Sequence, residues 1–199
     1  MIQPTVYSRH QIIDAAYDLV RESGWSALST RALAKRIGCS TMPIYSQVRS
    51  VAELEDVLLK RAYEALQACQ MILFTDNPLL NLAIGYVVFA RDERQLFRFL
   101  FLDKADQVGS GQFTGLREAF DKNTMRAEKH LAALDSIPVG SQESLIQHTW
   151  IYTHGLAMMV NAGMLGDCSD DVIQAYLNHA GGAFYHMATM TTQGGAYDA

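Results

Sequence analysis

Between Leu28 and Arg49 the sequence carries side chains suited to contact nucleic acid. Hydroxyl and amide groups gather towards the end of this stretch, and basic residues stand on both sides of them. A glutamine amide forms two hydrogen bonds with adenine and an arginine guanidinium forms two with guanine, so Gln47 and Arg31 are candidates for base contacts. Further residues expected to approach base edges or thymine methyl groups are Thr41, Met42, Pro43 and Ser46, and Ser40 is another candidate for DNA contact.

The first half of this stretch has the pattern of a short helix. Ser29 or Thr30 can cap it, because a hydroxyl oxygen there accepts hydrogen bonds from free backbone N–H groups. Helical spacing then places apolar residues on one face. Gly38 follows, where the left-handed turn that ends many helices favours glycine. The apolar face consists of Leu33, Ala34 and Ile37.

A second short helix is predicted directly after Gly38. Ser40 or Thr41 can cap it, and Pro43 falls in its first turn, where a missing N–H has no cost. Ile44 is expected to pack inwards. Two helices joined by a tight glycine turn form the helix-turn-helix motif, whose second helix enters the DNA major groove.

The distribution of charge agrees with a DNA-contacting segment. Residues 1–49 hold six basic and three acidic residues, a balance of +3, whereas the whole chain has −5, so residues 50–199 carry −8. A locally basic segment on an acidic protein is typical of a module that faces phosphates. A basic helix surface exposed only to water is the simpler explanation of the charge taken alone.

Residues from Met1 to about Tyr63 resemble the N-terminal domain of the tetracycline-repressor (TetR) family of one-component transcription regulators. The resemblance covers about a third of the chain. It implies that Thr30 and Tyr45 bind phosphates through their hydroxyl groups, with Lys35, Arg36 and Arg49 as further phosphate contacts. The residues that carry it are Ile12-Ile13-Asp14-Ala15-Ala16, Gly24, Thr30-Arg31-Ala32-Leu33-Ala34, Gly38, Ile44-Tyr45 and Leu54.

The remaining pattern predicts an all-α protein, with a three-helix head on a larger helical body. We expect the head at residues 1–50, a connecting helix at 51–75 and the body at 76–199. Serine and glutamine or glutamate, three residues apart, predict capping boxes at Ser8 and Ser50. In the body, helices are expected at 79–90, 95–102, 113–134, 141–164 and 169–187, with a loop at 108–111 and a frayed end from 193.

Trp150, His154 and Gly155 resemble a C-terminal domain type of the same family that has a tryptophan and then His-Gly in its penultimate helix. This resemblance and the small residues of the last two helices predict a homodimer through those helices. An ordinary helical core is the alternative explanation of the same residues. The small residues are Gly155, Ala157, Ala162, Ala180, Gly181, Gly182 and Ala183.

The apolar body is expected to sense a small hydrophobic or amphipathic effector that releases the protein from its operator, as in a repressor. Large side chains on body helices are candidates to line such a cavity, and each can equally belong to a solid core. The candidates are Tyr86, Phe89, Phe97, Phe101, Trp150, His154 and Met158.

The sequence offers little for other kinds of chemistry. It has no nucleophile elbow, phosphate-binding glycine loop or metal-binding Cys-x-x-Cys or His-Glu-x-x-His motif, so we expect no enzyme, cofactor or metal site. The apolar run from Leu79 to Ala90 is shorter than a membrane span, and three widely spaced cysteines are typical of a reduced, cytoplasmic protein. A helical interaction or dimerisation module without DNA binding, and a helical enzyme, are the competing hypotheses.

Overall fold

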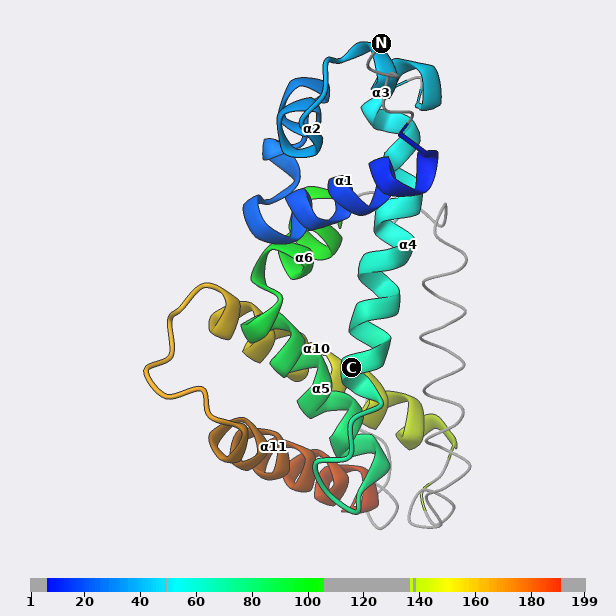
Figure 1. Ribbon diagram of the computed structural model, residues 1–199. Coiled ribbons are helices and arrows are strands. Elements are labelled where there is room, and N and C mark those ends of the chain that lie inside the picture. The colour runs from blue at the N-terminus through cyan, green and yellow to red at the C-terminus, as the bar shows by residue number, and fades with distance from the viewer. Residues whose placement is uncertain (1–6, 49, 106–136, 138, 191–199) are drawn as a thin grey trace. The chain divides into compact units, whose positions relative to one another are not determined.

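The computed structural model describes residues 7–48, 50–105, 137 and 139–190 (Figure 1). These residues form helices joined by turns, and none of them lies in a β-strand. The predicted all-α fold is therefore confirmed. The expected loop at 108–111, the expected helix at 113–134, the tail from 193 and Arg49 lie outside the described residues.

Contacts between Cα atoms divide the chain into two compact units. The first contains described residues 7–48, 50–65 and 93–105, and the second contains 66–92, 137 and 139–190. This division differs from the predicted boundaries, because residues 93–105 were expected in the body. The helices of the first unit are α1 (Arg9–Ser23), η1 (Trp25–Ala27), α2 (Thr30–Ile37), α3 (Met42–Gln47), most of α4 (Val51–Gln70), α6 (Arg94–Arg98) and the π-helical turn η2 (Phe99–Asp103).

Helix α1 begins at the predicted capping box. The Ser8 hydroxyl accepts a hydrogen bond from the Gln11 backbone N–H at 3.2 Å, and the Gln11 side chain accepts one from the Ser8 N–H at 2.9 Å. The helix ends at Gly24, whose φ of 85° favours glycine. Its apolar face is fully buried and forms the floor of the first unit through Ile12, Ala16 and Val20.

The segment 93–105 completes the core of this first unit. Phe99, which is fully buried, stacks on Trp25 with ring centroids 5.0 Å apart. Lys104 also contacts Trp25, with its Nζ 4.5 Å from the centroid of the ring. The same Nζ lies 2.8 Å from the Glu55 carboxylate. Arg21 of α1 pairs with Glu93. The sequence shows that this apolar segment must be buried but does not show against which core.

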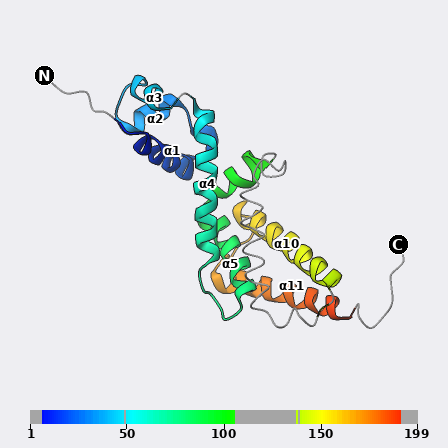
Figure 2. The same cartoon turned by 90° about the vertical axis from the view of Figure 1, so that its right-hand side faces the viewer.

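The second unit contains α5 (Pro78–Asp92), α10 (Val139–Asn161), α11 (Asp170–Met190) and the end of α4. Helices α10 and α11 lie side by side against α5 in both views (Figures 1 and 2). The buried Asn161 amide donates to the Ala90 carbonyl at 2.9 Å. Arg91 donates to the Cys168 carbonyl at 2.7 Å and to the Asp170 carboxylate at 2.8 Å, so both ends of the turn after α10 are fixed to α5.

Two predicted details of this unit needed correction. Helix α10 begins two residues before the expected Ser141 and ends at Asn161 rather than near Met164, because Gly163 adopts a φ of 71°. Ala157 is fully buried within its own unit, whereas Gly155 and Ala183 are exposed, so the expected small-residue surface does not include Ala157. In the part of the chain that the structure describes, no helix is long and apolar enough to span a membrane.

Candidate nucleic-acid interface

The turn between α2 and α3 has the geometry that the sequence predicts. Ser29, rather than Thr30, is the N-cap of α2, and its hydroxyl accepts a hydrogen bond from the Ala32 N–H at 3.1 Å. Gly38 ends the helix in the left-handed region (φ 78°, ψ 34°), and its N–H donates to the Ala34 carbonyl at 2.9 Å. A side chain at this position would be strained, because L-residues rarely adopt this φ.

Helix α3 is fixed by its buried side and presents the other side to solvent. Ile44 and Val48 are each only 3% exposed, as expected for Ile44. Met42 is 76% exposed and Tyr45 is 56% exposed. A six-residue helix gains little stability from its own hydrogen bonds, so these buried anchors determine how the exposed side chains are presented.

The predicted hydroxyl cap of α3 was wrong. Thr41 precedes the helix with φ −72° and ψ −19°, and its side chain makes no capping hydrogen bond. Pro43 does lie in the first turn, so fewer N–H groups need a cap there. The Thr41 hydroxyl is therefore not used to cap α3. Ser46, by contrast, donates its hydroxyl to the Pro43 carbonyl at 2.7 Å.

Arg9, which the sequence did not single out, joins three helices around α3. Its guanidinium donates to the backbone carbonyl of Gln47 at 2.9 Å and to the Glu53 carboxylate at 2.6 Å. Gln47 is the last residue of α3, where a cation complements the helix dipole and satisfies a free carbonyl. Only the 38-residue separation of Arg9 and Gln47 in sequence hides this contact from pattern analysis.

The basic residues of α2 fall into two groups. Arg36 forms two hydrogen bonds with Glu22, at 2.6 and 2.7 Å, and these lower the pKa of that carboxyl group. Arg31 and Lys35 are exposed and have no acidic partner within the described residues. Arg31 and Lys35 therefore remain as cations of α2 that can bind phosphate without first breaking an ion pair.

Every described residue of the predicted DNA-contacting set lies on α2, α3 or the turn between them, in one unit. Half-buried positions are Thr30, Thr41, Pro43 and Gln47, and exposed positions are Arg31, Ser40, Met42, Tyr45 and Ser46. The arrangement offers hydroxyl, amide, guanidinium and apolar groups on a short, anchored helix and the helix before it. Such groups can contact both phosphates and base edges.

The seven predicted effector-contacting residues do not form one group. In the second unit the Tyr86 hydroxyl and His154 Nδ1 are hydrogen-bonded at 2.8 Å, and the Trp150 ring stacks on His154 at 5.4 Å. Burial lowers the pKa of His154. Phe97 and Phe101 contact each other at 4.9 Å in the first unit. Phe89 is fully buried and Met158 is half-buried, so their role in effector binding stays a prediction.

Residues that could hold a metal ion do not gather in the described chain. Among those residues no group of three or more His, Cys, Asp or Glu side chains is placed to ligate a metal. Cys39, Cys69 and Cys168 are half-buried and are not joined in disulfide bonds.

Comparison with known proteins supports the fold. No protein-family model and no curated protein matches the chain. A protein of unknown function from Rhodococcus sp. RHA1 has a similar structure, with a TM-score of 0.69 and 22% identity over 94% of this chain and 100% of that one. A transcriptional regulator from the same organism has a TM-score of 0.61 and 18% identity over 92% of this chain and 98% of its own. Over most of its length this chain thus shares its helical fold with a transcriptional regulator.

Proposed function

We propose that this protein is a cytoplasmic, sequence-specific DNA-binding transcriptional regulator of the TetR type, acting as a repressor. The observation that carries the proposal is the presentation of α3. Its apolar side is buried through Ile44 and Val48, while Met42 and Tyr45 project into solvent immediately after a glycine turn. Exposed apolar and aromatic side chains that lie together on one helix form a surface suited to contact a partner.

Roles on the interface follow from side-chain chemistry. Lys35 is a cation on α2 with no acidic partner among the described residues, and Tyr45 and Thr30 carry hydroxyl groups, so these three residues position the head on phosphates, whereas Arg31 can pair with guanine. Sequence is read by α3 itself. Gln47 can form a bidentate pair with adenine, and Met42 and Pro43 can contact thymine methyl groups.

One such head makes too few contacts to select an operator among many competing sites, so the proposal includes a homodimer. Ile151, Gly155 and Met159 lie four residues apart on α10 and are all exposed, which makes a continuous apolar stripe. A Cβ added at Gly155 would meet no atom within 4 Å, so a neighbouring helix can approach closely there. Two-fold symmetry then requires half-sites about 34 Å apart, or a multiple of that distance.

Release from DNA would follow from a shift in the equilibrium between two states of the protein, one that binds the operator and one that does not. A small molecule that binds the second unit more tightly in one state favours that state, and it changes operator affinity only by its differential affinity for the two. The proposed repressor is therefore expected to lose operator affinity in the presence of a suitable effector.

Selection of bound sequences from a random DNA pool tests the DNA-binding proposal directly. We expect an enriched, two-fold symmetric site, and affinity that falls steeply with salt concentration. Tyr45→Ala and Thr41→Ala are each expected to weaken binding to that site by roughly tenfold, since a good polar contact contributes about 1–3 kcal/mol.

Ser26→Ala is a matched control, because Ser26 is an exposed hydroxyl in the same unit outside the predicted contacts. Unchanged operator affinity and salt dependence in both the Tyr45 and Thr41 variants would mean that α3 is not the reading helix. Absence of any enriched sequence would favour the interaction module without DNA binding.

A further inference from the structure

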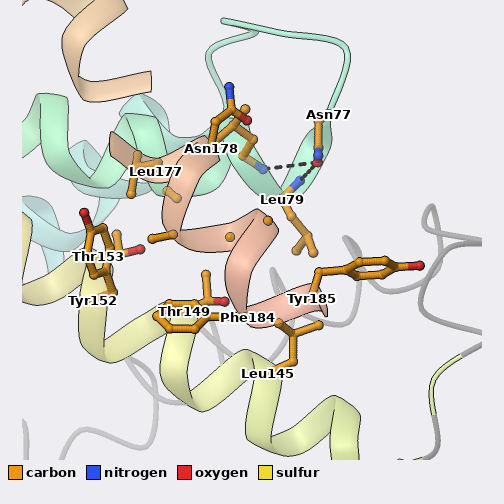
Figure 3. A pocket seen from close by; sticks show the side chains of 15 residues that line it. Asn77, Leu79, Leu145, Thr149, Tyr152, Thr153, Leu177, Asn178, Phe184 and Tyr185 are labelled. Carbon is orange, nitrogen blue, oxygen red and sulfur yellow. Dashed lines mark hydrogen bonds between the residues drawn. The ribbon is translucent and has the colours of Figure 1, made fainter. Parts of the chain in front are cut away.

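A cavity of about 340 Å³ lies within the second unit, between the start of α5, the middle of α10 and the second half of α11 (Figure 3). None of the seven effector-contacting residues predicted from the sequence lines it. A cavity of roughly 150 Å³ lined by apolar side chains holds benzene, so this one has room for a larger molecule, about the size of two fused rings.

The lining contains a polar group without a partner. Thr153, on α10, is 7% exposed, and its hydroxyl oxygen is buried with no hydrogen-bond partner among the residues that the structure describes. Buried polar groups are nearly always hydrogen-bonded, because leaving one unpaired costs stability. Asn77, which also lines the cavity, is already engaged, since its side-chain oxygen accepts hydrogen bonds from the N–H groups of Leu79 and Leu80 (Figure 3). Among the polar atoms of the described lining residues, the Thr153 hydroxyl oxygen is the one that is buried without a partner.

Two adjacent glycines form part of the opposite wall. Gly181 and Gly182 lie inside α11, where glycine destabilises a helix relative to alanine. A Cβ added to either one would meet no atom within 4 Å, so packing within the chain does not require glycine there. Their absent side chains leave space beside the helix backbone that faces the cavity.

The lining also defines what can enter. Among the described residues that line it there is no Asp, Glu, Lys, Arg or His, so an ionised group would lose its hydration without gaining a counter-charge from them. Much of the wall is apolar and aromatic, with Leu145 and Tyr152 on α10 and Leu177 and Phe184 on α11. The Tyr152 and Phe184 rings meet edge to face, with their centroids 6.1 Å apart.

We propose that this cavity binds an uncharged, mainly apolar small molecule with one hydrogen-bonding oxygen, such as a phenol, an alcohol or a ketone, and that Thr153 binds this oxygen. The site names the effector class of the regulator proposed above and rests on that proposal for its consequence on DNA, but binding itself does not depend on it.

Three probes that share the naphthalene ring system test the assignment by isothermal titration calorimetry on the full chain at pH 7. They are 2-naphthol, naphthalene and 2-naphthoate, which are respectively a neutral hydroxyl compound, its apolar parent and an anion. We expect 2-naphthol to bind most tightly and 2-naphthoate at least tenfold more weakly. Equal affinity for 2-naphthol and 2-naphthoate, or no binding of 2-naphthol at millimolar concentration, overturns the proposal.

Substitutions at Thr153 separate the contribution of its hydrogen bond to binding from the contribution of the cavity's shape. Thr153→Val keeps the shape and removes the hydroxyl, so we expect about fivefold weaker binding of 2-naphthol with naphthalene affinity unchanged. Thr153→Ser retains the hydroxyl and should retain the preference for 2-naphthol over naphthalene. Because the hydroxyl is unpaired in this structure, Thr153→Val should unfold at the same or a higher temperature than the unsubstituted protein. A 2-naphthol affinity unaltered by Thr153→Val overturns the role of this residue.

Filling the cavity supplies a second, independent test. Ala180→Leu places extra volume in the lining, whereas Ala175→Leu makes the same change on an exposed position of the same helix outside it. Only Ala180→Leu should abolish binding of all three probes. Binding that survives Ala180→Leu locates the probe elsewhere, and a shift of the monomer–dimer equilibrium by Ala180→Leu without any probe binding shows that a second copy of the chain fills the cavity.

Operator binding, measured on the same samples, keeps the two proposals apart. Probe binding with the expected pattern but no DNA binding leaves the site intact and removes the proposed function. DNA binding without probe binding supports the proposed function and overturns the proposed cavity site. When both are present, 2-naphthol should weaken operator binding in the unsubstituted protein and not in Ala180→Leu.

Discussion

At the scale of single residues, Gly85 shows how closely two helices of the second unit approach. A Cβ added there would lie 2.3 Å from the backbone carbonyl oxygen of Cys69 and 2.6 Å from the Cα of Gln70. Neither atom can move without displacing the end of α4. Gly85 thus sets the distance between the end of α4 and α5 within this unit.

Gly85→Ala is expected to lower the free energy of unfolding by about 1–3 kcal/mol, because a methyl group is forced against backbone atoms. The matched control is Gly166→Ala, at an exposed glycine between α10 and α11 where an added Cβ meets no atom, and it should change this free energy by less than about 0.5 kcal/mol. Thermal unfolding followed by circular dichroism compares the two variants. Equal effects from both substitutions would contradict the close approach at Gly85.

His154 is expected to make stability depend on pH. Burial lowers the pKa of this imidazole in the folded protein, so the unfolded chain binds a proton more readily. Stability contributed by the neutral ring is complete above about pH 6.5 and is lost as the pH falls from there through the folded pKa. Chemical denaturation at pH 7.5 and pH 5.5 should therefore show a larger loss in the native chain than in His154→Gln. A loss of equal size in both would mean that other groups govern this pH range.

At the scale of elements, the predicted capping positions have different consequences. Ser29 caps α2 with its hydroxyl, whereas the expected cap on α3 is not made. Ser29→Ala should therefore lower the free energy of unfolding by about 1 kcal/mol, since one N–H at the start of α2 loses its partner. Ser26→Ala, which removes an exposed hydroxyl that caps no helix, should change stability by less than about 0.5 kcal/mol. Indistinguishable unfolding curves for the two variants would argue against the cap.

Local signals in the sequence predicted most of these elements. Capping residues and apolar spacing located α1, α2 and α5, and Gly38 located the turn before α3. Contacts between distant segments were not predictable, because spacing along one helix does not identify its neighbour. Arg9 bound to Gln47 is one example, and Phe99 stacked on Trp25 is another.

The cavity escaped prediction for a different reason. Sequence reasoning favoured large aromatic residues as its lining, but several of these are fully buried, as Phe89 and Phe97 are. The space lies instead beside two glycines and a threonine, and the absence of side-chain volume gives no sequence signal. Gly181 and Thr153 line the same cavity only because α5, α10 and α11 pack together as they do.

At the scale of the whole molecule, the proposed dimer is the property on which operator selection depends. Ile151→Arg places a charge in the exposed apolar stripe of α10 and is expected to convert a dimer to a monomer, because an unpaired charge in an interface loses its hydration. Sedimentation velocity measures the change, and operator affinity should fall by at least tenfold with it. Asp76→Arg, an exposed position outside α10 and α11, should leave both unchanged. A dimer that persists in Ile151→Arg would place the interface on another surface.

The first unit is built from two separate stretches of the chain, residues up to 65 and residues from 93, and this affects how the protein folds during synthesis. Its core needs Leu96, Phe97 and Phe99, which are synthesised only after α4 and α5 have been completed. Until they emerge, the nascent head has apolar surface around Trp25 that nothing covers, and α5 must leave the exit tunnel before the head can close. The chain therefore cannot complete its two units in simple N-to-C order, and the unit that carries the proposed DNA-contacting residues is complete only when about a hundred residues have been translated.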